Sequence, residues 1–252
     1  MEIKKYKKDK GNTYKVYIDD EIVILYDDVI VKYNLLCNKN IDIKLFNEII
    51  DYNLFLDGYY KAIKYINKKM RTELEINKYL KKLNIKDADI EKIIKLLYKD
   101  GYLNKEVYLK AYINDQFNLT SNGPLKVIKE LISLGYYEIE IKSYINELNW
   151  DSKVEKLVNK KIKLNSKLSN NALKTKVLND IIKLGYEKES ILYYLDKVEL
   201  CSDNDNLLRE YNKIYNKYCK RHSGNELEYK LINYLFKKGF NIEDIKRCID
   251  EN

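Results

Sequence analysis

The residue types that could perform metal or nucleophilic chemistry are few and scattered along this chain. Four cysteines occur, Cys37, Cys201, Cys219 and Cys248, and His222 is the only histidine. A structural zinc site needs four such ligands at short spacings, and only Cys219 and His222 lie three residues apart. Two ligands do not make a site. We therefore expect no metal, and we expect reduced thiols that lie partly in the core.

The sequence also lacks the patterns that accompany catalysis. Aspartate and glutamate are abundant, so carboxylate pairs at helical spacing arise by chance and do not by themselves indicate hydrolysis. The phosphate-binding motif G-x-x-x-x-G-K-[ST] is absent. An enzyme that acts on nucleic acid remains an alternative without a motif to support it. The sequence predicts a protein without catalytic residues or cofactors.

Positive charge, in contrast, is concentrated in two blocks. Residues 58–105 contain 13 Lys and Arg against 6 Asp and Glu, and residues 156–202 contain 10 against 5. The candidate contact residues are Lys68, Lys69, Arg71, Lys78, Lys81 and Lys82 in the first block and Lys160, Lys161, Lys163 and Lys167 in the second. These blocks predict contact with an anionic surface, although a solvated basic face would give the same counts. Tyr65 and Tyr79 are near these lysines and are expected either to stack on bases or to pack within the protein.

Composition limits the remaining classes. The chain has 252 residues, 45% of them hydrophobic, which is enough for an ordinary globular core. No run of about 18 apolar residues is present, so no transmembrane helix is expected. Charged residues follow Met1 directly, which argues against a secretory signal. We expect a cytoplasmic protein that does not contact a membrane.

The first 57 residues have the pattern of a small α+β module. Residues 13–18 and 21–26 alternate β-branched or aromatic residues with others, and Asp19 and Asp20 between them favour a tight turn, so a β-hairpin is predicted. Residues 27–33 fit either a further strand or a short helix. Residues 42–52 are typical of a helix, with Asp42 as its N-cap.

From Gly58 onward the hydrophobic period becomes helical and the sequence repeats itself. Four turn segments can be superimposed, residues 83–85, 134–136, 184–186 and 238–240, with central residues Asn84, Gly135, Gly185 and Gly239. Both residue types tolerate the left-handed conformation that ends a helix. Each is followed by an apolar or aromatic residue, as the hydrophobic contact of such a cap requires.

Apolar residues recur at fixed offsets from these turns. Four positions before each turn are Leu80, Leu131, Ile181 and Leu235, and eight before are Ile76, Val127, Val177 and Leu231. Six positions after are Ile90, Ile141, Ile191 and Ile245, and ten after are Ile94, Ile145, Leu195 and Ile249. Positions four residues apart share one helix face, so each turn joins two amphipathic helices.

Each helical pair is preceded by a further helical segment, approximately residues 59–69, 106–118, 152–168 and 206–221. The predicted fold is therefore mainly α, with tandem three-helix repeats that form an elongated curved array after the α+β module. The predicted domains are residues 1–57 for the module and 58–105, 106–150, 151–200 and 201–252 for repeats one to four. The alternative is one compact helical bundle. Pro124 fits the first turn of a helix, and Trp150 is expected to pack between repeats.

Several segments of this repeated region resemble the RecX family. Residues 64–75 (KYINKKMRTELE) resemble the first family signature, a short helix that ends in a basic segment followed by Arg/Ser-x-x-Glu-Leu. Residues 101–105 (GYLNK) resemble a further family segment, but Lys105 replaces the usual acid. Leu109 also stands where a small residue is common. Residues 111–113 (AYI) and 123–127 (GPLKV) resemble the second repeat of the family, whose helix normally begins after a glycine.

The N-terminal module, with its hairpin and following helix, resembles that of long RecX proteins, so the resemblance covers nearly the whole chain. The third and fourth repeats match only at the level of the repeat, and the specificity of the resemblance comes from the order of the segments. It implies a RecA regulator without catalytic residues, which lies along the helical groove of the RecA–single-stranded DNA filament. Such proteins commonly inhibit ATP hydrolysis and strand exchange. The RecA filament is thus the expected partner of a monomeric chain, and direct contact with single-stranded DNA is a further expectation. The alternative function is a DNA-binding helical module that acts alone.

Overall fold

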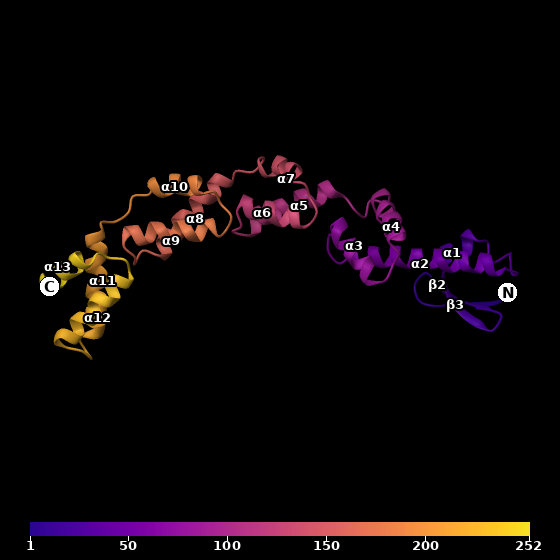
Figure 1. Ribbon diagram of the computed structural model, residues 1–252, viewed down its shortest axis with the longest axis horizontal. Helices are drawn as coiled ribbons and strands as arrows, with labels where there is room; N and C mark the ends of the chain where they lie inside the picture. The colour runs from indigo at the N-terminus through magenta and orange to yellow at the C-terminus, as the bar shows by residue number, and fades with distance from the viewer. The chain divides into compact units, whose positions relative to one another are not determined.

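The computed structural model describes residues 1–252, and Figure 1 labels its helices and strands. The chain divides into two compact units, Met1–Ala111 and Tyr112–Asn252. The first unit opens with three strands, β1 (Ile3–Lys8), β2 (Thr13–Ile18) and β3 (Glu21–Tyr26). All other elements are helices: α1 Asp27–Lys32, α2 Ile43–Ile66, α3 Glu73–Lys82, α4 Asp87–Lys99, α5 Lys105–Leu119, α6 Pro124–Ser133, α7 Glu138–Ile145, α8 Trp150–Leu164, α9 Asn170–Ile182, α10 Lys188–Asp196, α11 Asp203–Tyr218, α12 Gly224–Lys237 and α13 Ile242–Asp250. The predicted fold class, mainly α after a small α+β module, is confirmed.

The predicted hairpin is present, with β2 and β3 antiparallel and Ile18 opposite Glu21. Asp19 in the turn has a φ of 48°, a left-handed conformation that aspartate tolerates better than most residues. Alternation along the strands turns Val16, Ile18 and Leu25 toward the core, where each is at most 1% exposed. The hairpin therefore supplies one apolar face for the helices of the first unit.

A third strand, β1, pairs with β2 and was not predicted. Four of its six residues are lysines, and only Ile3 is fully buried. Such a pattern is typical of an edge strand, because lysines there prevent pairing with other chains. Tyr6 fixes the strand further by donating a hydrogen bond to the carbonyl of Leu35 (2.7 Å).

Residues 27–33, which fitted a strand or a helix, form the helix α1. Asp27 and Asp28 lie in its first turn, where negative charge interacts favourably with the helix dipole. Val29 and Ile30 point into the same core as the hairpin. The apolar run at residues 29–31 is thus a short helix with one buried side.

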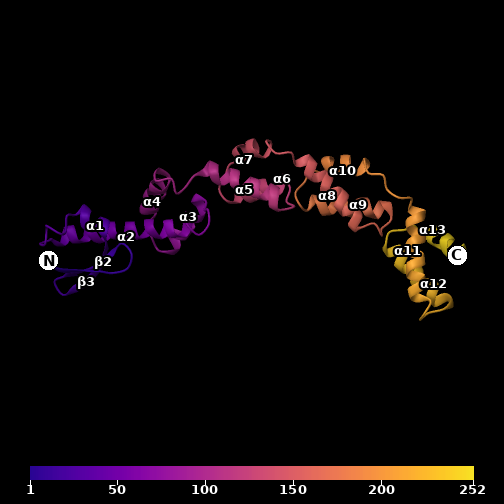
Figure 2. The same ribbon diagram turned by 180° about the vertical axis from the view of Figure 1, so that it is seen from behind.

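Helix α2 corrects the prediction of two separate helices at residues 42–52 and 59–69. It is one continuous helix of 24 residues that passes through residues 57 and 58, with Asp42 as its predicted N-cap. Gly58 is helical and buried, and a Cβ atom there would lie 2.9 Å from Cδ1 of Ile93 in α4. This glycine therefore allows close helix packing and does not mark a boundary. Figures 1 and 2 show the sheet beside the first half of α2 and helices α3 and α4 near its end.

Tyrosine hydroxyls tie α2 to its neighbours. Tyr26 of β3 donates to Asp57 (3.0 Å), and Tyr59 donates to Asp100 at the end of α4 (2.6 Å). Burial, and then the bonded carboxylate, raise the pKa of both hydroxyls well above the ordinary value of tyrosine. Both bonds therefore have a neutral donor throughout the physiological pH range.

The four superimposed turns have the predicted geometry. Asn84, Gly135, Gly185 and Gly239 have φ values of 58°, 93°, 92° and 86°. In three of these turns, the residue after the left-handed one donates a hydrogen bond from its amide to the carbonyl five residues earlier. Examples are Tyr136 N to Leu131 O (3.2 Å) and Phe240 N to Leu235 O (3.4 Å). This is the Schellman arrangement of a helix C-terminus.

The repeated apolar positions form the cores. The residues four before and six after each turn are all at most 1% exposed. Repeat 1 consists of the end of α2 with α3 and α4, repeat 2 of α5–α7, repeat 3 of α8–α10 and repeat 4 of α11–α13. Within repeats 3 and 4 each helix packs against the other two (Figure 2). The helical repeat is confirmed, while the elongated curved form and the domain limits stay predictions.

In the second unit, repeat 3 is joined to repeat 2 by its turn glycine. The amide of Gly123, just before α6, donates to the carbonyl of Leu184 (2.7 Å), and Leu125 donates to Gly185 (3.0 Å). A Cβ atom on Gly185 would lie 2.5 Å from Cβ of Lys126, and one on Gly123 would lie 2.5 Å from the carbonyl oxygen of Gly185. Two backbones therefore meet at a distance that only glycine permits.

Repeat 4 joins repeat 3 in the same way. Ser169, the N-cap of α9, donates from its amide to Lys238 O (3.1 Å) and from its hydroxyl to Gly239 O (2.7 Å). A Cβ atom on Gly239 would lie 2.5 Å from Cβ of Ala172. The turn of one repeat thus contacts the start of the middle helix of the preceding repeat. We call this contact a junction, and it occurs between repeats 2 and 3 and again between repeats 3 and 4.

Trp150 packs between repeats 2 and 3, as predicted. Its ring meets Phe117 of α5 edge to face (5.0 Å between centroids, 87°) and Tyr186 beside the turn glycine (6.4 Å, 63°). Its Nε1 donates to the carbonyl of Ile145 at the end of α7 (3.0 Å). The side chain therefore contacts both repeats and satisfies its only polar atom.

Candidate nucleic-acid interface

Arg71 of the first predicted cluster is held within the protein. Its Nη1 lies 2.9 Å from Oε1 of Glu75, and its guanidinium covers the ring of Tyr65 at 4.0 Å. Tyr65 in turn stacks on Tyr79 (4.3 Å, 17°). Thr72 and Glu75 form a capping box at the start of α3. These contacts indicate that Arg71 and both tyrosines shape the α2–α3 turn.

The lysines of the first cluster lie in that turn and on the exposed side of α3. All five are exposed, and only Lys81 has an acidic partner, Asp87 at 3.2 Å. The lysines without an ion pair are Lys68, Lys69, Lys78 and Lys82. Exposed cations without an internal counter-ion are those best able to bind an anionic partner. The contact role of all six predicted residues stays a prediction.

The second predicted cluster lies at the end of α8 and in the loop that follows. Lys161 is half-buried and pairs with Asp180 of α9 (3.1 Å), so it stabilises repeat 3 internally. Lys160, Lys163 and Lys167 are exposed and have no ion pair. The structure therefore separates one structural lysine from three that are available for contact.

The net charge over long blocks of sequence did not reveal a third group of cations. Lys213 and Lys217 on α11, with Lys220 and Arg221 just after it, line an open groove together with Tyr218 and His222. The segment 203–252 contains 10 basic and 9 acidic residues, so its average hides this group. A window over residues 211–224, which contains four Lys or Arg and no Asp or Glu, is the signal that would have found it.

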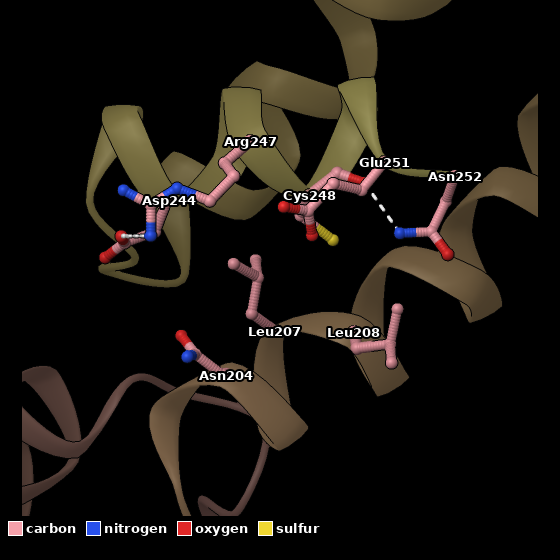
Figure 3. A pocket seen from close by; sticks show the side chains of 8 residues that line it. All are labelled: Asn204, Leu207, Leu208, Asp244, Arg247, Cys248, Glu251 and Asn252. Carbon is pink, nitrogen blue, oxygen red and sulfur yellow. Dashed lines mark hydrogen bonds and ion pairs between the residues drawn. The ribbon is translucent and has the colours of Figure 1, made fainter.

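A smaller pocket lies between α11 and α13 (Figure 3). Leu207 and Cys248 face one another across it, and Asp244 and Arg247 at its edge lie 3.8 Å apart. Burial raises the pKa of the Cys248 thiol, so the reactive thiolate is disfavoured. The pocket is best explained by the packing of repeat 4.

None of the helices combines the length and apolar character needed to cross a membrane. The structure contains no group of three or more His, Cys, Asp or Glu side chains that could hold a metal ion. Cys219 is exposed, while Nδ1 of His222 lies 2.9 Å from Glu226.

Known proteins resemble this chain along its full length. Residues 202–249 match the family model described as RecX, third three-helix domain. The chain is 29% identical over 261 residues to Regulatory protein RecX of Staphylococcus aureus (strain Newman), which covers 100% of this chain and 94% of that protein. It is also 29% identical to Regulatory protein RecX of Lactococcus lactis subsp. cremoris (strain MG1363), over 92% of this chain and 90% of that protein.

Solved structures show the same fold. A crystal structure of regulatory protein RecX superimposes with a TM-score of 0.67 at 20% identity, over 78% of this chain and 100% of that one. The crystal structure of RecX from Lactobacillus salivarius gives a TM-score of 0.53 at 21% identity, over 57% and 97%. With the repeated three-helix units, these comparisons show that the chain is similar to RecX regulatory proteins over nearly its whole length and matches their third three-helix domain at residues 202–249.

Proposed function

We propose that this chain binds the RecA–single-stranded DNA filament as a monomer in the cytoplasm, and that it inhibits ATP hydrolysis and strand exchange in recombination and repair. The observation that carries the proposal is the repeat itself, in a chain whose full-length relatives are named regulatory proteins. A filament presents the same surface at regular intervals. A chain that repeats one building block can present the same contact more than once, so weak contacts add up.

The exposed lysines without ion pairs support an anionic partner. They occur beside α3 in repeat 1 and at the end of α8 in repeat 3. A filament that carries DNA phosphate and acidic protein surface would complement such charges, which raise the rate of association more than they raise affinity. Within the second cluster we favour Lys160, Lys163 and Lys167 as contact residues, because they are exposed and have no ion pair. Lys161 between them is paired with Asp180.

The expected result is inhibition of DNA-stimulated ATP hydrolysis by RecA at substoichiometric to near-equal concentrations of this protein. A variant with Lys160→Gln, Lys163→Gln and Lys167→Gln should inhibit less. A variant with Lys142→Gln, Lys174→Gln and Lys188→Gln, of the same net charge, is the matched control and should inhibit like the wild type. Unchanged hydrolysis and strand exchange at saturating wild-type protein would exclude the proposed function.

The same lysines also favour the alternative, a helical module that binds DNA without RecA. That function predicts tight, sequence-dependent binding to duplex DNA. Helix pairs joined by a short turn are a common way to place a helix in the major groove. Weak binding that depends strongly on salt and little on sequence would exclude this alternative.

A further inference from the structure

The groove at the C-terminal end of α11 is defined by its charge. Lys213, Lys217, Lys220 and Arg221 are all exposed along it, and none of them forms an ion pair. No aspartate or glutamate lines the groove, whose volume is about 450 Å³. We call these four residues and this space the α11 groove. Four positive charges thus converge on one concave surface without an internal counter-ion.

The helix dipole explains only part of this arrangement. Cations in the last turn of a helix interact favourably with its carbonyl end, and Lys217 is the one cation that lies in the last turn of α11. Lys213 lies one turn earlier, while Lys220 and Arg221 follow the end of the helix. The helix dipole therefore does not account for Lys213, Lys220 and Arg221.

The basic positions of the α11 groove recur in the preceding repeat. Lys217 and Arg221 follow Lys163 and Lys167 by 54 residues each, the same spacing that separates the turn glycines Gly185 and Gly239. Arg209 near the start of α11 donates to Ser166 O in the loop after α8 (3.0 Å), which fixes the end of one basic region against the helix that carries the next. Lys217 lies about 12 Å further along α11, from a rise of about 1.5 Å per residue.

We propose that the α11 groove binds the phosphodiester backbone of single-stranded nucleic acid, which then continues toward Lys163 and Lys167. A protein partner fits less well, because the centre of a protein interface is depleted of charged residues, lysine among them. Tyr218, which also lines the groove, is half-buried and packs against the core of repeat 4. A backbone of regularly spaced phosphates is bound by cations along a positively charged groove.

The inference deepens the proposed function, on which it rests for the choice of single-stranded nucleic acid. It assigns the contact with DNA to repeats 3 and 4. The test uses the full chain without RecA, however, so the two proposals can fail separately. A wild-type chain that binds the oligonucleotide but does not inhibit RecA would exclude only the proposed function.

The experiment measures fluorescence anisotropy of a labelled 20-residue oligothymidylate at several salt concentrations. Lys217→Gln with Arg221→Gln should weaken binding at least tenfold at low salt. The slope of log affinity against log salt should fall in magnitude by about 1.4, which is 0.7 for each of two lost phosphate contacts. The matched control, Lys237→Gln with Lys246→Gln, removes the same charge from exposed positions of repeat 4 outside the groove and should bind like the wild type.

Three results would overturn the inference. The first is a wild-type chain that does not bind the oligonucleotide at low salt. The second is an equal loss in both variants, which would indicate a general effect of net charge. The third is a groove variant that keeps its oligonucleotide affinity but loses affinity for the filament, which would assign the groove to an acidic protein surface. Circular dichroism checks that both variants are folded, as expected for exposed positions.

Discussion

Replacing Gly185 by alanine should lower the free energy of unfolding by about 2–5 kcal/mol, combining left-handed backbone strain of about 1–2 kcal/mol with overpacking of about 1–3 kcal/mol. The strain arises because the φ of Gly185 is 92°. The overpacking arises because the new Cβ would lie 2.5 Å from Cβ of Lys126, across the junction. Neither backbone can withdraw without breaking the bonds from Gly123 to Leu184 and from Leu125 to Gly185.

Gly224→Ala is the matched control for this substitution. Gly224 also has a positive φ, 56°, in the same unit, but a Cβ atom there would have no neighbour within 4 Å. Gly224→Ala should therefore lower the free energy of unfolding only by the backbone contribution of about 1–2 kcal/mol. Urea denaturation measures the loss in each of the two variants, with unfolding monitored by circular dichroism and by the fluorescence of Trp150, the only tryptophan. Equal losses for the two variants would show that the close approach at the junction contributes nothing.

Trp150→Ala should have the largest effect of any single substitution at this junction, a loss of about 3–5 kcal/mol, as is usual when a buried tryptophan is truncated. The side chain is 9% exposed and separates Phe117 from Tyr186, so its removal leaves a cavity between two repeats. Lys153 would be affected as well, because its ammonium lies over the rings of Trp150 and Phe117 and bonds to the carbonyl of Phe117. Denaturation by urea, followed by circular dichroism, measures the loss.

Trp150→Phe separates the packing from the polar contribution. Phenylalanine retains most of the ring contacts but cannot donate to the carbonyl of Ile145, so the expected loss is about 1–3 kcal/mol, the cost of one unsatisfied buried group. A Trp150→Ala variant that loses less than its phenylalanine counterpart would contradict the view that repeats 2 and 3 share a packed interface.

The repeats could be predicted because each one carries local signals. A glycine or asparagine ends one helix, and apolar residues at fixed offsets mark the buried faces on either side. These are properties of neighbouring residues, so one sequence suffices to find them. The junctions could not be predicted in the same way. Gly123 and Gly185 are 62 residues apart, and neither residue type indicates the other as its partner.

The two misjudged elements of the first unit also have physical explanations. Strand β1 buries only one residue fully, so its four lysines resemble a solvated tail. Gly58 resembles a helix end because glycine is unfavourable within helices. In the structure the close approach of Ile93 explains the absence of a side chain at this position. Both cases show tertiary contacts overriding a local preference.

The candidate site was predicted in part. The first two basic clusters follow from net charge over long blocks, and that method also selected Arg71 and Lys161, which are paired within the protein. Glu75, four residues after Arg71, is a local signal of such pairing on a helix. The α11 groove escaped the same method because acidic residues at both ends of repeat 4 cancel its charge.

The most direct test of the central proposal, that this chain binds the RecA filament, is electron microscopy of RecA–single-stranded DNA filaments with saturating protein. The account predicts additional density at regular intervals in the helical groove, which disappears when RecA is omitted. Filaments indistinguishable from those without the protein, under conditions in which the chain remains folded, would contradict it.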